Sequence, residues 1–224
     1  INIISQEVNM EKYLREPLNS LTHLIGAFLS LIALVLMLEK ALALNSSTLS
    51  LVSVTIFGVS LILLYSTSSI YHLIIGNPKV IAFFRRLDHS MIFILICGSY
   101  MPFYLILLQG KDRIILTTII ITLTIAGILF KMFWFNCPRW LSTALYIGMG
   151  WIALFSFPLY KVISLYAFLW LLLGGMFYTI GGIIYGLKPK TLKLGRFGHH
   201  EIFHIFIIVG SLCHFISVFY YVLI

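Results

Sequence analysis

The sequence predicts an all-α integral membrane protein with one domain, residues 1–224, built as a seven-transmembrane helix bundle. Hydrophobic residues make up 61% of the 224 residues and charged residues only 10%, against about 25% charged residues in an ordinary soluble domain. The mean hydropathy is +1.05, and aromatic residues reach 15%, which excludes a disordered chain. Apolar runs from end to end exclude a lone signal peptide or a single anchor.

Seven apolar stretches are long enough to cross a bilayer, which takes about 20 residues of helix. The uncharged run 41–78 is too long for one helix, and Asn45-Ser46-Ser47-Thr48 predicts a turn near its start. Glycine and proline occur inside several stretches, which membrane helices tolerate. In chain order, the predicted helices cover residues 17–40, 49–73, 88–108, 113–134, 140–159, 162–186 and 199–222.

The distribution of basic residues predicts a cytoplasmic N-terminus and a C-terminus outside. Positive charge accumulates on the cytoplasmic side of membrane proteins, and only Lys40, Lys111, Arg113 and Lys161 fall on the other side. This orientation is opposite to that of a G-protein-coupled receptor. The eleven residues on the predicted cytoplasmic side are Lys12, Arg15, Lys79, Arg85, Arg86, Lys131, Arg139, Lys188, Lys190, Lys193 and Arg196.

The net charge of +8 would suggest a nucleic-acid partner if the protein were soluble. Here the basic residues lie between apolar runs, so membrane topology explains them and no nucleic-acid partner is expected. The loop from Lys188 to Arg196 serves the same topology or binds anionic lipid. Cys97, Cys137 and Cys213 show no CxxC spacing, so neither a disulfide framework nor a thiolate metal site is expected.

The predicted topology brings polar side chains from four segments to one depth, near the cytoplasmic face. Ionisable groups in a bilayer are costly and usually mark function. His214 lies deeper than the others, about 15 Å further along the seventh helix than His204. The residues at the shared depth are Glu16, Asn19 and His23 on the first helix, Ser68 and His72 on the second, Asp88 on the third, and His200 and His204 on the seventh.

The histidines of this layer predict a metal site. His200 and His204 are one helical turn apart, so both imidazoles can reach one metal ion, and His72 is the third candidate by depth. Three imidazoles with a fourth position left for water form the open arrangement of catalytic zinc. Asp88 could hold and deprotonate that water or orient a ligand histidine, and Ser68 could hydrogen-bond the same water or Asp88.

Each of these side chains also has a structural interpretation. A single intramembrane histidine can serve as a hydrogen-bonding group between helices. Asp88 could instead pair with Arg85 or Arg86, or cap the third helix, where a carboxylate suits the helix dipole. His89 is expected, together with His199, to face lipid headgroups or water.

The polar residues of the first predicted helix also have both a structural and a functional interpretation. Glu16 and Asn19 favour an N-terminal capping arrangement over a direct role in the site. His23 and His214 are expected to be packing or supporting groups rather than ligands. All four are therefore kept as supporting residues of the predicted site.

The segment His200-Glu201-Ile202-Phe203-His204 also satisfies H-E-x-x-H, the zinc metalloprotease pattern. Intramembrane proteases with this pattern generally take their remaining ligand from an Asp followed by Gly. Asp88 is followed by His89, and Asn77-Pro78 is followed by Lys79. A protease is therefore a minor alternative, and Glu201, about 100° around the helix from His200, is expected to be incidental.

Three blocks of the sequence resemble the hemolysin III group of the progestin and adipoQ receptor (PAQR) family. This group is similar to a wider superfamily of membrane hydrolases that includes the alkaline ceramidases. The blocks occur in the family's order and spacing across nearly the whole chain. They are Glu16-Pro17-Leu18-Asn19-Ser20-Leu21-Thr22-His23; Ser68-Ser69-Ile70-Tyr71-His72 with Arg86-Leu87-Asp88-His89-Ser90; and His200-Glu201-Ile202-Phe203-His204 with Cys213-His214-Phe215.

The resemblance implies a seven-helix bundle with a cytoplasmic N-terminus and Zn2+ held by His72, His200 and His204. It also implies that Asp88 lies near the water at the metal and that Ser68 matches the family serine. Adiponectin receptors resemble zinc-dependent lipid amidases with ceramidase activity, so a membrane lipid or lipid-like amide or ester is the expected substrate. Bacterial members carry the hemolysin name, which implies a multi-pass protein of the bacterial plasma (inner) membrane.

Two other functions stay open at this stage. One is a non-enzymatic sensor, regulator or receptor of membrane state, in which zinc has a structural role. The other is a cytolytic hemolysin. A monomeric pore is not expected, because the fourth to sixth predicted helices are nearly all apolar.

Overall fold

The computed structural model describes residues 15–189, 191–195 and 197–224. Within these ranges the regular structure is helical, apart from one isolated bridge between Leu194 and Phe197. The predicted all-α class is therefore confirmed. Three of the basic residues used to predict the orientation, Lys12, Lys190 and Arg196, lie outside the described residues.

Six helices in the described residues are long and apolar enough to cross a membrane. Five of them begin and end within three residues of the predicted boundaries, and the third is the exception. The six are α2 (Pro17–Ala43), α3 (Thr48–Leu73), α4 (Pro78–Pro102) with the π-helix η1 (Phe103–Leu107), α5 (Gly110–Phe133), α8 (Leu165–Leu187) and α9 (His199–Tyr221).

The predicted start of the third helix at residue 88 is wrong, because α4 begins ten residues earlier. Asn77 caps it by accepting a hydrogen bond from the backbone N–H of Val80 at 3.0 Å, and Pro78 occupies the first helical position, where its missing N–H has no cost. Lys79, Arg85 and Arg86, whose charges predict a loop when hydropathy alone is considered, lie on these additional turns of α4. Asp88 therefore sits nearly three turns inside α4 and does not cap it.

The predicted fifth helix, residues 140–159, is interrupted. It consists of α6 (Arg139–Gly150), the 3-10 helix η2 (Trp151–Phe155) and α7 (Phe157–Tyr160). The hydroxyl of Tyr100 lies 2.7 Å from the carbonyl oxygen of Gly150 and accepts the N–H of Ala153 at 2.9 Å. This side chain bonds the backbone groups that the change of helix type leaves free. Together, α6 and η2 have a rise of about 28 Å.

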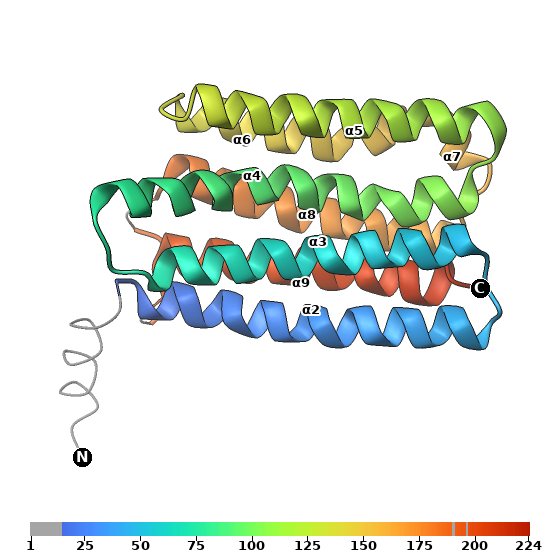
Figure 1. The fold of residues 1–224 in the computed structure, drawn as a ribbon, viewed down its shortest axis with the longest axis horizontal. Helices are drawn as coiled ribbons and strands as arrows, with labels where there is room; N and C mark the ends of the chain where they lie inside the picture. The colour runs from blue at the N-terminus through green and yellow to red at the C-terminus, as the bar shows by residue number, and fades with distance from the viewer. Residues whose placement is uncertain (1–14, 190, 196) are drawn as a thin grey trace, which may run out of the picture.

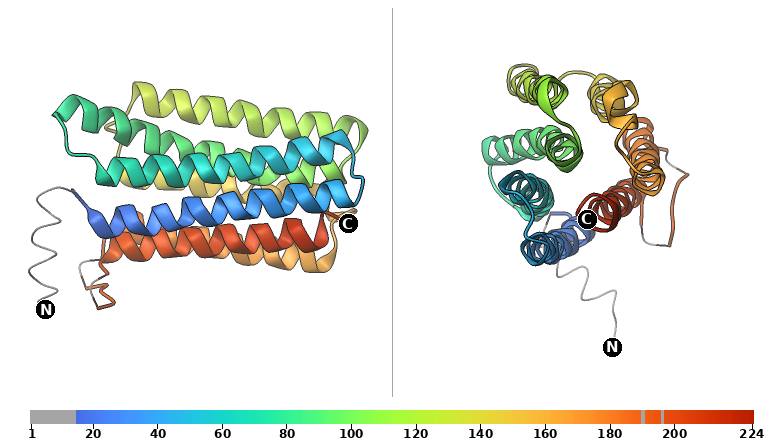
Figure 2. Two further views of the ribbon diagram at one scale, coloured as in Figure 1. Left: turned by 60° about the horizontal axis from the view of Figure 1, so that its bottom comes forward. Right: turned by 90° about the vertical axis from the view of Figure 1, so that its right-hand side faces the viewer.

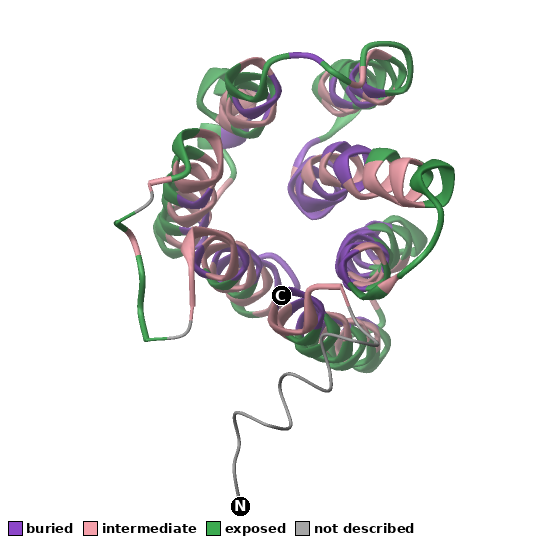
Figure 3. Cartoon of the chain, turned by 90° about the vertical axis from the view of Figure 1, so that its left-hand side faces the viewer, coloured by how far each residue is buried: buried purple, intermediate pink, exposed green. Residues whose placement is uncertain are grey.

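The helices run alternately up and down and form a ring. Consecutive helices pack side by side, except that α5 and α6 touch only slightly, and α9 returns to pack against α2 (Figure 1, and the end-on view of Figure 2). Buried residues lie mainly on the inward sides of the helices (Figure 3). The lipid-facing sides carry exposed large apolar residues such as Phe28, Ile114 and Leu165, as expected where the surrounding solvent is hydrocarbon.

One end of the bundle, called here the Pro17 end, brings together the segments that carry the candidate site residues predicted from the sequence. The chain starts α2, ends α3, starts α4, ends α8 and starts α9 at this end, while Ile224 lies at the opposite end (Figure 1). Residues 16, 72 and 200, which are far apart in the sequence, are therefore brought to the same level.

A close approach between α3 and α4 provides a test of this packing. A Cβ atom added at Gly98 would overlap Ser60 Oγ and lie 2.6 Å from Ser60 Cβ, whereas one added at Gly148 would have no atom within 4 Å. Gly98→Ala should lower the free energy of unfolding by about 1–3 kcal/mol through overpacking. Thermal unfolding in detergent measures this, with Gly148→Ala as the matched control. Equal stability of the two variants would contradict the packing.

Candidate metal centre

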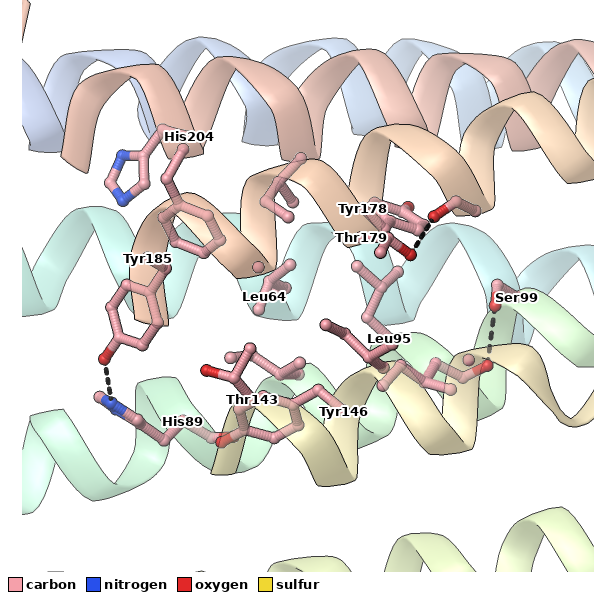
Figure 4. A pocket seen from close by; sticks show the side chains of 18 of the residues that line it. Leu64, His89, Leu95, Ser99, Thr143, Tyr146, Tyr178, Thr179, Tyr185 and His204 are labelled. Atoms are coloured by element: carbon pink, nitrogen blue, oxygen red, sulfur yellow. Dashed lines mark hydrogen bonds between the residues drawn. The ribbon is translucent and has the colours of Figure 1, made fainter. Parts of the chain in front are cut away.

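A cavity of about 450 Å³ opens inside the ring and extends from the Pro17 end past the middle of the bundle to Phe168 and Leu154. Most of its acidic, basic and histidine side chains lie at the Pro17 end, apolar side chains form much of the middle, and hydroxyl groups lie beyond them. Figure 4 shows His204, Tyr185 and His89 at one end and Tyr178, Thr179 and Ser99 at the other, with Leu64 between them. The volume falls in the range of small-molecule sites, about 300–1,000 Å³.

Three histidines meet at the polar end of this cavity. His72 lies in the last turn of α3, and His200 and His204 lie one turn apart at the start of α9. One nitrogen from each ring lies within 4.8 Å of the others, and the Nε2 atoms of His72 and His200 are 3.3 Å apart. His72 and His204 are almost fully buried, at 2% and 1% exposure. The three residues are called the histidine triad below.

The triad fits a divalent transition metal. Two nitrogen ligands of a tetrahedral zinc ion lie about 3.3 Å apart, given Zn–N bonds of about 2.05 Å, and His72 and His200 already have this spacing. Three imidazole nitrogens are also a donor set that zinc, copper and nickel accept. The described residues could therefore hold a metal ion between α3 and α9.

Glu16 supports His72 instead of capping its helix. It occupies the N-cap of α2, but its side chain makes no capping hydrogen bond, so the capping prediction is wrong. Its Oε2 lies 2.5 Å from His72 Nδ1 and 3.2 Å from Asn19 Nδ2. The hydrogen bond from His72, together with Arg15 beside it, lowers the pKa of the Glu16 carboxyl to about 2, so the ionised carboxylate accepts. His72 then donates through Nδ1 and keeps Nε2 facing the triad.

Asp88 lines the same cavity as the triad, although it is not part of the three-histidine cluster. Its nearest ionisable partner in the described residues is His89, whose Nδ1 is 3.7 Å from Asp88 Oδ2. The alternative pairing with Arg85 or Arg86 is not found there, because both guanidinium groups lie over the ring of Phe135. The carboxylate is thus available to a molecule in the cavity.

Ser68 lies on α3 one turn before His72 and also lines the cavity. Its side chain is buried, with 2% exposure. The spacing of four residues places the hydroxyl and the His72 imidazole on one helix face. The structure therefore brings Ser68, Asp88 and the triad to one cavity, with Glu16 behind them.

His89 is buried at 9% exposure, so the expectation that it faces headgroups or water is wrong. Its Nδ1 lies 2.7 Å from the carbonyl oxygen of Arg85 and its Nε2 lies 3.0 Å from the hydroxyl of Tyr185 (Figure 4). Because a carbonyl only accepts, Nδ1 carries the proton and Tyr185 donates to Nε2. Sequence reasoning missed Tyr185, which has no distinctive spacing on α8.

His23 and His214 pack against other rings and lie outside the three-histidine cluster found in the described residues. The His23 ring stacks on the ring of His204, with centroids 3.5 Å apart. His214 packs against Tyr178, and a Cβ at Gly174 would lie 2.6 Å from its Nε2. The described residues offer no hydrogen-bond partner to either nitrogen of either histidine.

Two other side chains of the motif blocks have local roles. Glu201 Oε2 accepts the N–H of Gly198 at 2.9 Å and so caps α9, which leaves the H-E-x-x-H pattern without its glutamate at the triad. Thr22, which sequence reasoning quoted but did not single out, places Oγ1 3.0 Å from His204 Nδ1. Its position between Asn19 and His23, on the polar face of the first helix, is the sequence feature from which a role near the triad could have been predicted.

Comparison with known proteins identifies the family. The family model described as "Haemolysin-III related" matches residues 11–215. The chain belongs to the haemolysin III family. It is 38% identical to "Hemolysin-3" of Bacillus cereus over 216 residues, which cover 96% of this chain and 95% of that protein. It is 39% identical to "Hemolysin-3 homolog" of Bacillus subtilis (strain 168) over 207 residues, covering 92% and 93% of the two chains.

A shorter match extends to receptors of the wider PAQR family. The chain is 42% identical to "ADIPOR-like receptor IZH2" of Saccharomyces cerevisiae over 50 residues, covering 20% of this chain and 16% of that protein. The family predicted from the three motif blocks is thereby confirmed. The family and the six long apolar helices together establish an integral, multi-pass membrane protein.

Metal analysis tests the triad directly. Purified wild-type protein should retain about one equivalent of a divalent transition metal, and His204→Ala should lose it because two imidazoles hold the ion far more weakly than three. His199→Ala is the matched control, since His199 begins the same helix but lies outside the triad. Mass spectrometry of the metal content gives the result. Equal metal content in wild type and His204→Ala would rule out the triad as the site.

Proposed function

We propose that this protein is a zinc-dependent membrane hydrolase that cleaves amide or ester bonds in lipid-like substrates. The observation that carries the proposal is that the histidine triad and Asp88 line one end of a cavity whose middle is lined by apolar side chains. A group of candidate catalytic residues and an apolar stretch thus belong to one cavity. An acyl chain with a carbonyl at one end has the matching polarity.

A zinc ion held by His72, His200 and His204 would supply a Lewis acid that activates water and polarises the substrate carbonyl. Asp88 accepts a proton from the attacking water and returns it to the departing nitrogen or oxygen. Ser68 hydrogen-bonds the water or the Asp88 carboxylate. The apolar wall, which includes Leu64, Ile92, Leu95, Ile147, Leu171 and Ile207, receives the acyl chain and excludes bulk water from the reacting end.

We also propose seven membrane spans, with α6, η2 and α7 together forming the fifth. Together α6 and η2 are about 28 Å long, and with α7 they occupy one place in the ring (Figure 2). Both observations support this count. The basic residues at the Pro17 end, among them Arg15, Arg85, Arg139 and Lys188, favour a cytoplasmic Pro17 end. The relatives from Bacillus favour the bacterial plasma membrane.

Asp88→Ala separates catalysis from metal binding. The variant should stay folded and metal-loaded but lose at least about 100-fold in kcat/KM, because general acid–base groups contribute about 10²–10⁴-fold. Fatty acid release from a panel of lipid amides and esters, measured beside zinc content, gives both quantities. Asp112→Ala, an exposed aspartate at the opposite end of the bundle, is the matched control. Full activity in Asp88→Ala, or no release by the zinc-loaded wild type, would contradict the hydrolase.

A second candidate is a non-enzymatic sensor or receptor of membrane state. The observation that favours it is that the triad joins α3 to α9, so a metal ion there would clamp two helices. In that case His72→Ala unfolds the protein, and Asp88→Ala retains biological activity. The same pair of variants therefore distinguishes the two functions.

A third candidate is cytolysis, which the names of the Bacillus relatives favour. The interior of the bundle offers little support for a conducting pore, because the middle of the cavity is lined by leucine and isoleucine. Dye leakage from liposomes that contain the purified protein would support cytolysis. Intact liposomes would remove that support.

A further inference from the structure

Thr22 on α2 contacts His204 of the histidine triad but is not itself a candidate metal ligand. Its Oγ1 lies 3.0 Å from His204 Nδ1 and donates to the backbone carbonyl of Asn19 at 2.8 Å. A hydroxyl has one proton, so the bond to Asn19 leaves the oxygen as an acceptor toward His204. His204 must then carry its proton on Nδ1, and its Nε2 is the bare nitrogen.

We propose that Thr22 is a positioning residue for the metal site, a role that rests on the proposed zinc site. Its hydroxyl holds the His204 proton on Nδ1 and so keeps Nε2 free to bind the metal. A neutral imidazole has two tautomers, and only one of them offers a lone pair at a given nitrogen. In the other tautomer, His204 would direct an N–H toward His72 and His200.

The arrangement of α2 around the triad supports this role. Glu16 does for His72 what Thr22 does for His204, because each accepts a hydrogen bond from the Nδ1 of a triad histidine. His23, the residue after Thr22, stacks on the His204 ring with an interplanar angle of 16°, which restricts rotation of that ring. The helix α2 and its N-cap residue, which supply no ligand, thus favour one tautomer of two ligands and restrict the orientation of one.

The opposite proton arrangement makes the opposite prediction. If Thr22 donated to His204 Nδ1, the proton of His204 would lie on Nε2, and the hydroxyl would oppose metal binding. Loss of the hydroxyl would then leave the zinc affinity unchanged or make it stronger. The sign of the change in affinity therefore decides between the two arrangements.

Zinc affinity of the purified full chain, measured by competition with a chelator, tests the proposal. Thr22→Val keeps the shape of the side chain and removes the hydroxyl, so zinc binding should weaken by about 10- to 100-fold, as for other residues that orient metal ligands. Thr22→Ser keeps the hydroxyl and should bind zinc like the wild type. Thr55→Val is the matched control, because exposed Thr55 hydrogen-bonds the carbonyl of Leu51 in its own helix and makes no other side-chain hydrogen bond within the described part of the chain.

The melting temperature of the metal-free protein shows whether each variant is folded at the temperature of the zinc titration. Thr22→Val should lower it more than Thr55→Val does, because the buried His204 loses a hydrogen-bond partner. Measured on folded protein, the zinc affinity should fall in Thr22→Val and stay at the wild-type value in Thr22→Ser and Thr55→Val. Thr22→Ala, which also lacks the hydroxyl, repeats the measurement if Thr22→Val does not fold. Wild-type affinity in both hydroxyl-free variants, or weak binding in Thr22→Ser, would overturn the role of Thr22 and leave the metal site standing. A wild type that binds no zinc would overturn the metal site itself.

Discussion

The meeting of two imidazole nitrogens 3.3 Å apart, between the end of α3 and the start of α9, is the constraint on which the functional end of the bundle depends. In the tautomer of His72 that donates through Nδ1 to Glu16, Nε2 has a lone pair that can accept a proton from His200 or bind a cation. His72 is buried and His200 is partly buried, and an unpaired polar group there would be costly. The need of the His72 imidazole for partners at both nitrogens thus explains why Glu16 and His200 are held against it.

The first helix connects this chemistry to the stability of the bundle. The last turn of α3 has carbonyl oxygens with no partner inside the helix. The backbone N–H of Glu16 donates to the carbonyl of His72 at 3.0 Å, and the Arg15 guanidinium donates to that of Tyr71 at 2.5 Å. The segment that orients His72 therefore also completes the hydrogen bonding of its helix, so folding of this end and ordering of the site occur together.

Site residues could be predicted from the sequence where helical periodicity or depth in the membrane determines their position. The one-turn spacing of His200 and His204 places both rings on one face of any α-helix, and the alternation of spans brings His72 to their level. The start of α4 was misplaced because Lys79, Arg85 and Arg86 were read as loop, although Asn77-Pro78 is a strong helix-start signal. Thr22 and Tyr185 were missed because their roles depend on how each helix is rotated about its axis, which hydropathy does not specify.

The break between α6 and η2 has a consequence for how the protein could change over evolutionary time. The hydroxyl of Tyr100 hydrogen-bonds the backbone where α6 changes to η2, in the cavity wall away from the Pro17 end. The curvature of that wall is therefore governed by a contact that no metal-facing residue shares. Under the proposed function, variation at this break reshapes the part of the cavity that receives a hydrocarbon tail while the histidine triad keeps its arrangement, so substrate selectivity can change separately from the reacting end.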